Sequence, residues 1–246
     1  MNKNILLFTA LFAIIYIFTN EKIYFKTYEQ STIINDKNTV VFSNINDVIL
    51  PKTYDAGQEY IDKIYFVGDS TTYHFFKAGI SRTHILVPDS LTLKLSSDIN
   101  NITVGYEGLT IAKAIKNAKC EIVIITIGVN GADSFTKIKY KTYYKKLIED
   151  IEKESPNTKI ILQSVFPVTK IYSDQNIGIT NSGIDKLNEW AKEIAFENGL
   201  KYLDTQSILK DANGAQFEYY NEKDGVHMNT KAYQAIIEYI RTHAID

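Results

Sequence analysis

Two short stretches of the chain carry side chains that could act together on an ester. "FVGDS" ends on Ser70 directly after an apolar run, and "DGVHMN" contains Asp224 and His227. A serine hydroxyl becomes a nucleophile when a neighbouring base takes its proton, and histidine serves well as that base. A carboxylate can hold the second ring nitrogen of the base and fix its tautomer. The sequence therefore predicts Ser70 as nucleophile, His227 as base and Asp224 as the acid that orients it.

An oxyanion that forms during such an attack needs hydrogen-bond donors, which complete the predicted site. The candidates are the backbone amides of Ser70 and Gly108 and the side-chain amide of Asn130, from the stretches "YEGLT" and "IGVNG". Glycine suits position 108 because a Cβ atom there would block a close approach of the backbone to a substrate. Gly105 is the alternative glycine in this region. We prefer Gly108 because it directly precedes the Leu-Thr pair that opens a predicted helix.

Further polar and aromatic side chains follow the serine or lie on a later predicted helix. The candidates for a substrate pocket are Asp69, Thr71, Tyr73, His74 and Asn181. His74 lies four residues beyond Ser70, and helical geometry would direct it back toward the site. The alternative interpretation is an imidazole that packs in the protein or lies on its surface.

The elements that must position these residues alternate along the chain. Short β-rich apolar runs lie at residues 63–67, 102–104, 121–128, 159–164 and 201–205, and helical spacing occurs at 109–118, 143–154, 182–199 and 229–243. Alternation of this kind predicts a mainly parallel sheet with helices on both faces, which is a three-layer α/β/α sandwich. The candidate residues follow predicted strand ends, where ligand sites form in such sheets.

Composition is typical of one sizeable α/β core and gives no sign of a nucleic-acid partner, a metal or a cofactor. The chain has 246 residues, of which 45% are hydrophobic, and its formal net charge is −2. This charge gives no overall field that would attract nucleic acid. The single cysteine, Cys120, precedes an apolar run and is predicted to be a core residue. Neither a HExxH or Cys/His cluster nor a GxxxxGK[ST] motif occurs, so we predict no metal and no cofactor.

The amino-terminal stretch predicts a membrane connection. Lys3 precedes an almost wholly apolar run at residues 5–19. Its length falls between that of a signal-peptide core and that of a full membrane span. Since no small-x-small cleavage site follows, we favour an uncleaved signal-anchor helix over a cleaved signal peptide or a buried helix. The predicted division is an anchor or signal at 1–22, a tether and lead-in segment at 23–60, and an extracytoplasmic domain at 61–246.

The four blocks "FVGDS", "YEGLT", "IGVNG" and "DGVHMN" resemble, in order and spacing, those of the SGNH (GDSL) hydrolase family over about residues 61–243. The stretch "SVFPV", with Asn181 and Asn188 on the next helix, resembles the bacterial carbohydrate-esterase branch. Membership implies a flavodoxin-like sandwich and a metal-free Ser-His-Asp mechanism. Two departures stand out: Gly131 replaces an acidic residue found in many members, and the segment at 71–74 is bulkier than usual.

The expected function is that of a serine esterase removing O-acetyl groups from a cell-envelope or extracellular polysaccharide through an acyl-Ser70 intermediate. The same residues would serve an O-acetyltransferase that works with an integral-membrane acyl-donor partner. A lipase or lysophospholipase and an inactive carbohydrate-binding scaffold are weaker alternatives. The expected partners are an acylated carbohydrate and, through the amino-terminal run, the membrane.

Overall fold

The computed structural model describes residues 18–19, 22–23, 42–87 and 108–245. The chain forms two compact units, Met1–Thr39 and Val40–Asp246. In the first unit, β1 (Phe18–Thr19) pairs antiparallel with β2 (Lys22–Ile23). The predicted anchor helix would end at Phe18 and Thr19, but these aromatic and β-branched residues adopt the extended backbone that they favour. Residues 5–17 of the apolar run lie outside the described residues.

Within the described part of the chain, no helix combines the length and the apolar character that crossing a membrane would require.

The second unit contains a five-stranded sheet whose strands all run parallel. Its strands are β3 (Ile64–Gly68), β4 (Ile85–Leu86), β5 (Ile122–Thr126), β6 (Lys159–Gln163) and β7 (Lys201–Leu203). Their spatial order is β4-β3-β5-β6-β7, which is the strand order of flavodoxin-like folds. Four predicted strands are confirmed; the one at 102–104 lies outside the described residues, and β4 was not predicted.

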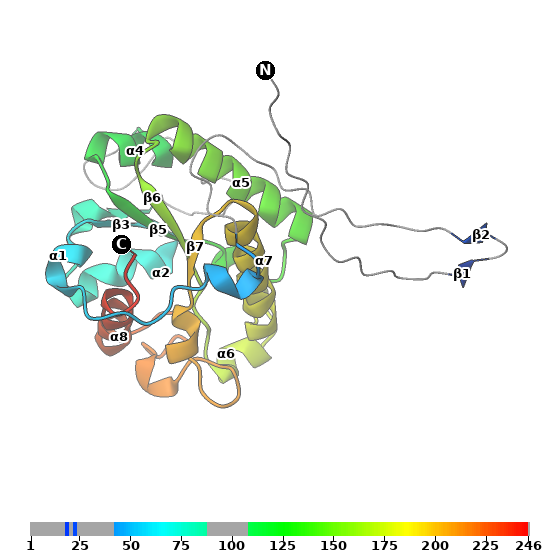
Figure 1. Cartoon of the computed structure of the whole chain (residues 1–246). Helices are drawn as coiled ribbons and strands as arrows, with labels where there is room; N and C mark the ends of the chain where they lie inside the picture. Colours follow the sequence, from blue (N-terminus) through cyan, green and yellow to red (C-terminus); the bar gives the residue numbers. More distant parts are fainter. Residues whose placement is uncertain (1–17, 20–21, 24–41, 88–107, 246) are drawn as a thin grey trace, which may run out of the picture. The chain divides into compact units, whose positions relative to one another are not determined.

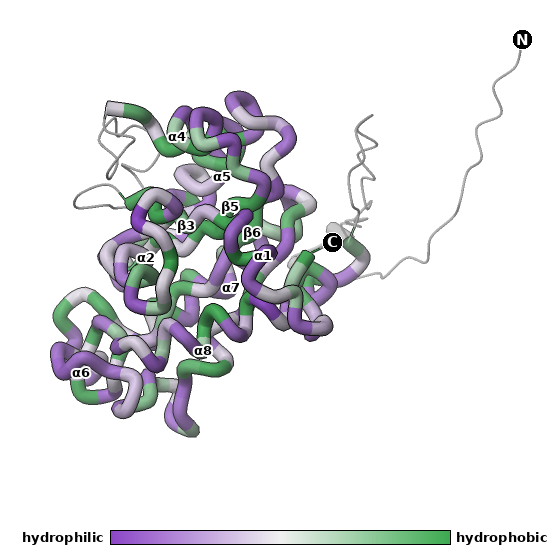
Figure 2. Tube along the Cα trace, turned by 90° about the vertical axis from the view of Figure 1, so that its left-hand side faces the viewer, coloured by the Kyte–Doolittle hydropathy of each residue, from purple (hydrophilic) through white to green (hydrophobic). Residues whose placement is uncertain are grey.

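Helices cover both faces of this sheet and confirm the three-layer sandwich (Figure 1). On one face, α4, α5 and α7 bury residues against Val123 and Ile125 of β5, while α1 and α8 pack on the face of Ile122 and Ile124. The helices alternate hydrophilic and hydrophobic residues along their length (Figure 2). Their bounds are α1 Gly57–Ile61, α2 Ser70–Tyr73, α4 Ile111–Ala118, α5 Lys137–Glu154, α6 Lys170–Asp174, α7 Asn181–Glu197 and α8 Thr230–Arg241.

Six short 3₁₀ helices connect these elements in the described part of the chain. They are η1 Ile45–Val48, η2 His74–Ala78, η3 Arg82–His84, η4 Val129–Gly131, η5 Thr205–Ile208 and η6 Glu218–Tyr220. Two of them matter for the site, because η2 continues α2 after the predicted nucleophile and η4 carries Asn130.

Residues 42–60, which the sequence analysis assigns to a tether and lead-in segment, belong to the same compact unit as the sheet. Val48 and Leu50 are buried in the core, and the Leu50 amide donates to the Tyr202 carbonyl at 2.9 Å. Asp55 forms an ion pair with Arg241 at the end of α8. The folded unit therefore begins well before residue 61, since apolar side chains from this segment complete the core.

Candidate active site

Ser70 stands where the interior strand β3 gives way to a helix. The strand ends at Gly68, and Ser70 is the exposed first residue of α2. A Cβ atom on residue 68 would lie 2.4 Å from the carbonyl oxygen of Thr126 on the neighbouring strand. Glycine therefore lets β3 and β5 meet closely at the point where the serine emerges. The hydroxyl lies at the carboxyl edge of the sheet, as predicted.

Asp69 stabilises the turn between β3 and α2. Its side chain is only 1% exposed and caps α2 by accepting from the Thr71 amide at 3.0 Å and the Thr71 hydroxyl at 2.7 Å. Its other oxygen accepts from the amides of Gly128 and Val129, at 3.4 and 3.3 Å. Burial raises the pKa of Asp69, although these hydrogen bonds act in the opposite direction.

Two of the substrate-pocket predictions therefore need correction. Asp69 and Thr71 are buried, at 1% and 2% exposure: the Asp69 carboxylate accepts from backbone amides, and the Thr71 hydroxyl donates to that carboxylate, so neither polar group faces solvent. Through Asp69, the loop after β3 is tied to the loop after β5, which carries Asn130. Both residues position the site, and neither presents its side chain to a substrate.

The three residues predicted from "FVGDS" and "DGVHMN" form a connected series, in which His227 lies within hydrogen-bonding distance of both Ser70 and Asp224. His227 Nε2 is 3.3 Å from Ser70 Oγ, across 157 residues of sequence. On the other side of the ring, His227 Nδ1 is 2.6 Å from Asp224 Oδ2. The second oxygen of Asp224 accepts from the backbone amides of Val226 and His227, at 2.9 and 2.8 Å. With Nδ1 protonated toward Asp224, Nε2 is left free to accept the serine proton.

Asp224 is held in its ionised form by these contacts. Partial burial acts to raise the pKa of Asp224, but hydrogen bonds from the His227 ring and from the His227 and Val226 amides outweigh it and leave the pKa below its usual value. An ionised carboxylate at this place can stabilise the imidazolium that forms only when His227 takes the serine proton. The pair can thus receive a proton from Ser70.

A tight hairpin formed by residues 221–228, here called the base loop, carries Asp224 and His227. Asn221 organises it: its Oδ1 accepts from the amides of Lys223 and Gly225, and its Nδ2 donates to the His227 carbonyl at 3.1 Å. Gly225 has a φ of +86°, and a Cβ atom there would lie 2.6 Å from the Cβ of Tyr172 on α6. The sequence analysis missed Asn221, although an asparagine three residues before Asp224 is a recognisable turn signal.

The predicted oxyanion donors lie on three separate loops. Ser70 offers its backbone amide at the amino terminus of α2. Asn130 is exposed on η4, directly after the loop that Asp69 binds. Gly108 has a φ of +78°, a conformation that glycine adopts without strain, and it precedes Thr110, the cap of α4. Gly105, the alternative, lies outside the described residues.

The unusual Gly131 has a packing explanation. A Cβ atom on residue 131 would lie 2.2 Å from the ring of Phe135, which packs edge-on against Tyr140 with ring centroids 5.6 Å apart. No side chain fits there unless Phe135 moves. The acidic residue of the family pattern is therefore excluded by the aromatic residue that follows, and nearby Asp133 instead accepts a hydrogen bond from the Thr180 hydroxyl at 2.7 Å.

Asn181 and Asn188 act on the backbone of the segment that follows β6. Asn181 Oδ1 accepts from the Val168 amide at 3.0 Å, and its Nδ2 donates to the Val168 carbonyl at 2.9 Å. Asn188 makes the same pair of bonds to Val165, at 2.7 and 3.0 Å. Asn188 is fully buried and is therefore not a polar residue of the helix surface. Since the amide of Asn181 is occupied by Val168, its prediction as a pocket residue is also corrected to a positioning role.

The segment held by these asparagines reaches the base loop. The Thr169 amide donates to the Gly225 carbonyl at 2.9 Å, and Gln216 binds both the Pro167 carbonyl and the Asn221 side chain. A network of buried and partly buried hydrogen bonds therefore runs from α7 to the loop that carries the base. None of these links is visible as a sequence motif.

Tyr73 and His74 remain close to the site. Tyr73 is partly buried, and its hydroxyl accepts a hydrogen bond from Arg82. His74 packs beside the base, with its ring centroid 5.0 Å from that of His227. Burial lowers the pKa of His74, and the nearby Lys77 and His227 act in the same direction. Among the predicted pocket residues, His74 has a ring contact with the base.

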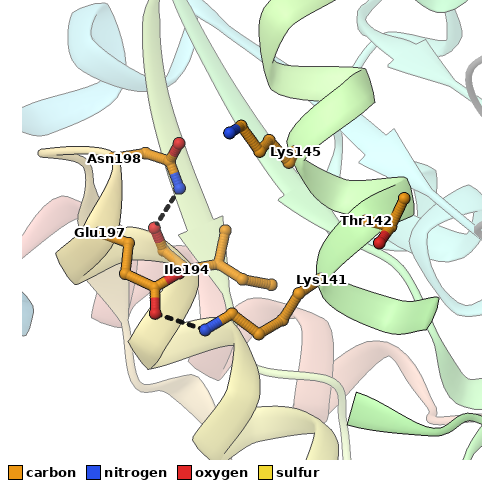
Figure 3. Close-up of a pocket in the computed structure, with 6 residues that line it drawn as sticks. All are labelled: Lys141, Thr142, Lys145, Ile194, Glu197 and Asn198. Atoms are coloured by element: carbon orange, nitrogen blue, oxygen red, sulfur yellow. Dashed lines mark hydrogen bonds and ion pairs between the residues drawn. The ribbon is translucent and has the colours of Figure 1, made fainter. Parts of the chain in front are cut away.

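Two other features are separate from this site. Cys120 is buried in the core, as predicted, and burial raises the pKa of its thiol to about 12, so it offers no competing nucleophile. A hollow of about 170 Å³ lies between α5 and α7. Figure 3 draws the residues that line it, among them Lys141 and Glu197, which form an ion pair. None of its lining residues was predicted to take part in catalysis.

Residues 66–235 match the sequence profile of the GDSL-like lipase/acylhydrolase family. A curated relative, the N-acylneuraminate cytidylyltransferase of Streptococcus agalactiae serotype III, is 25% identical over 204 residues, which cover 72% of this chain and 46% of the relative. The chain thus spans about half the length of the curated relatives that it matches.

Solved structures share the fold. A GDSL-like lipase from Bacteroides thetaiotaomicron superimposes with a TM-score of 0.56 at 18% identity, covering 76% of this chain and 89% of the other. The periplasmic domain of a lipopolysaccharide acetyltransferase from Salmonella ser. Paratyphi A gives a TM-score of 0.53 at 16% identity, covering 72% and 81%. At these identities the likeness concerns the fold alone.

Proposed function

Because the chain belongs to the GDSL-like lipase/acylhydrolase family, we propose that it is a serine esterase that removes O-acetyl groups from a cell-envelope or extracellular polysaccharide. The observation that carries this proposal is the hydrogen-bonded series Ser70–His227–Asp224, with contacts of 3.3 and 2.6 Å. This series has the connectivity that serine acyl transfer needs, and the nucleophile is exposed.

The reaction proceeds in two acyl transfers. Ser70 Oγ attacks the ester carbonyl carbon while His227 Nε2 takes the hydroxyl proton. The tetrahedral intermediate then breaks its bond to the sugar oxygen, which receives the proton from His227, and the acetyl group stays on Ser70. A water molecule attacks this acyl-enzyme with His227 again as base, acetate leaves, and the proton returns to Ser70. Asp224 remains ionised throughout and stabilises the imidazolium.

Developing negative charge on the carbonyl oxygen is met by the amides of Ser70 and Gly108 and by the Asn130 side chain. The Ser70 amide lies in the first turn of α2, where backbone N–H groups have no partner within the helix. The positive φ of Gly108 and the exposure of Asn130 support their assignment as donors. Such donors contribute roughly a hundredfold to a thousandfold each to acyl transfer.

The acetylated sugar is proposed from the resemblance of "SVFPV" to the carbohydrate-esterase branch and from the predicted location. O-acetylated N-acylneuraminates belong among the first sugars to test, because the curated relatives are named for that sugar. An O-acetyltransferase is the alternative, since the fold is shared with an acetyltransferase domain. It would use the same acyl-Ser70, with a sugar hydroxyl instead of water as the second acceptor.

The experiment compares the wild-type chain with Ser70→Ala. Acetate release from p-nitrophenyl acetate is followed with and without an oligosaccharide acceptor, and product sugars are analysed for added acetyl groups. Ser70-dependent acetate release that the acceptor leaves unchanged supports the esterase. Acetylated oligosaccharide formed at the expense of free acetate identifies a transferase, and a preference for long acyl chains identifies a lipase. Equal negligible rates in both proteins overturn the catalytic proposal and favour the binding scaffold.

We further propose that the domain acts outside the cytoplasmic membrane, tethered through the apolar run at residues 5–19. The support is the composition of that run and its position after Lys3. The test is cell fractionation with external protease treatment of a carboxyl-terminally tagged chain. A membrane-associated tag that the protease removes from intact spheroplasts supports the proposal. A tag recovered in the soluble cytoplasmic fraction contradicts it.

A further inference from the structure

The imidazole of His74 touches the imidazole of the base. The two ring centroids are 5.0 Å apart and the ring planes are inclined by 58°. His74 is the first residue of η2 and lies one helical turn beyond Ser70, so one continuous segment carries both the nucleophile and this second ring. Such proximity is within van der Waals range for ring atoms. The proposed function gives His74 no role in proton transfer.

The surroundings of His74 hold it in place. Tyr233 of α8 and Phe76 of η2 meet its ring edge-on, with centroid distances of 6.3 and 5.9 Å. Tyr233 is itself fixed by a 2.6 Å hydrogen bond from its hydroxyl to the Thr71 carbonyl. Lys77, also on η2, forms a 2.6 Å ion pair with Glu222 and donates to the Met228 carbonyl. The ion pair and the hydrogen bond of Lys77 therefore join the η2 segment to the base loop next to the contact between the two rings.

The ring nitrogen Nδ1 of His74 is buried and has no hydrogen-bond partner. Protonation there would bury an N–H group without an acceptor, which is costly. The titratable and charged groups around the ring are Tyr73, Lys77, Glu222, Asp224, His227 and Tyr233. Burial and the neighbouring cations lower the pKa of His74 more than the two carboxylates raise it. The ring thus stays neutral while His227 becomes charged.

We propose that His74 is a positioning residue for the base: its ring packs against the imidazole of His227 and fixes the direction from which Nε2 faces Ser70. Asp224 holds only one ring nitrogen, about which the imidazole could still tilt. The contact with His74 removes this freedom. Tight packing that aligns a base raises the catalytic rate, because even small displacements of a reacting group slow the reaction. The inference rests on the proposed esterase function.

Three substitutions at residue 74 separate packing from charge. In His74→Ala we expect kcat for p-nitrophenyl acetate to fall about tenfold with KM changed less than twofold, because the base is misaligned. In His74→Phe, which keeps a flat ring without a titratable group, kcat returns to within about threefold of wild type. In His74→Lys the added positive charge disfavours the His227 imidazolium, so the acid limb of the kcat–pH profile shifts to lower pH by about one unit.

His84 supplies the matched control. It also stacks on an aromatic ring, Tyr65 at 4.2 Å, but it precedes β4 and binds the carbonyl of Ile64 at the start of β3. His84→Lys should leave the acid limb and kcat unchanged. The proposal is overturned if His74→Ala keeps the wild-type kcat. It is also overturned if His74→Phe is as slow as His74→Ala at the same melting temperature, or if the acid limb of the kcat–pH profile does not shift in His74→Lys.

The NMR titration of His227 gives a readout that needs no substrate. In the full-length chain, the midpoint of the His227 ring signals should fall by about one pH unit in His74→Lys and stay in place in His84→Lys. If the titration midpoint of His227 shifts in His74→Lys but the protein hydrolyses no ester, the ring contact is supported and the esterase function is rejected. If the midpoint does not shift in a protein that is an active esterase, only the role of His74 is rejected.

Discussion

Asp224 binds one imidazole and two backbone amides at once, so its substitution tests orientation apart from charge. Asp224→Asn retains the shape of the side chain, but its amide group would favour the wrong tautomer of His227. We expect kcat on p-nitrophenyl acetate to fall roughly 10³- to 10⁴-fold, with little change in KM. A loss below about tenfold would show that the carboxylate is not needed to orient the base. Circular dichroism checks that the variant is folded.

The lowered pKa of Asp224 also predicts how stability depends on pH. A carboxyl group whose pKa is lower in the folded than in the unfolded chain stabilises the fold above its unfolded pKa, and this contribution disappears as pH falls through the folded value. The free energies of unfolding of wild type and Asp224→Asn, measured in urea, should therefore differ by a constant amount above about pH 5, and this difference should shrink as the pH falls below the usual pKa of an aspartate. The effect is small because the carboxylate is half exposed. A gap that widens toward low pH would contradict this sign.

Gly131 tests whether packing explains the departure from the family pattern. Gly131→Ala places a methyl group against the ring of Phe135, so we expect a loss of about 1–3 kcal/mol in the free energy of unfolding. Phe135→Ala removes that ring. The double variant should be more stable than the sum of the single losses predicts, because the collision is then absent. Strict additivity in chemical denaturation would show that Phe135 is not the obstacle.

At the scale of elements, the base loop depends on a residue that touches no substrate. Asn221→Ala removes the hydrogen bonds to Lys223, Gly225 and the His227 carbonyl. We expect kcat to fall about tenfold through displacement of the base, and stability to fall by about 1–2 kcal/mol. Asn198→Ala is the control, since its amide donates to the Ile194 carbonyl at the end of α7 (Figure 3). Equal kcat in the two variants would contradict this role of Asn221.

The elements with strong periodicity could be predicted, and those held by single contacts could not. Continuous apolar runs identified β3, β5, β6 and β7, and the helical spacing at 229–243 identified α8, where Asn229 caps the helix by accepting from the Lys231 and Ala232 amides. The strand β4 has two residues, too few for any pattern to emerge. The start of α5 at Lys137 was also missed, since polar residues precede its apolar stripe.

For the site, the chemical types of Ser70, Asp224 and His227 and their places after predicted elements were enough to predict the contacts between them. A motif does not reveal which polar side chains form hydrogen bonds with the protein's own backbone. Asp69, Asn181 and Asn188 carry groups that would suit a substrate, yet each satisfies amides or carbonyls of the protein. Their roles depend on loops far apart in sequence, and only the folded chain brings these together.

At the scale of the whole molecule, the extent of the folding unit can be tested by truncation. A chain starting at residue 42 keeps Val48, Leu50 and the Asp55–Arg241 ion pair, whereas one starting at residue 61 loses them. We expect the first to melt as the full chain does and the second to lose several kcal/mol of stability, because buried apolar side chains are removed. Equal melting temperatures for the two truncated chains, measured by differential scanning fluorimetry, would contradict this expectation.

The contact that spans 157 residues, from Ser70 to His227, also sets the moment at which activity can begin. A ribosome that has passed β3, β5 and β6 has already produced the nucleophile and much of the sheet, but no base. The base loop and α8, which packs against η2, are translated long after the nucleophile, since His227 follows Ser70 by 157 residues. Under the proposed mechanism, a nascent or prematurely terminated chain that lacks the base loop has a serine without its base, so we expect no ester cleavage until that loop has been made and folded.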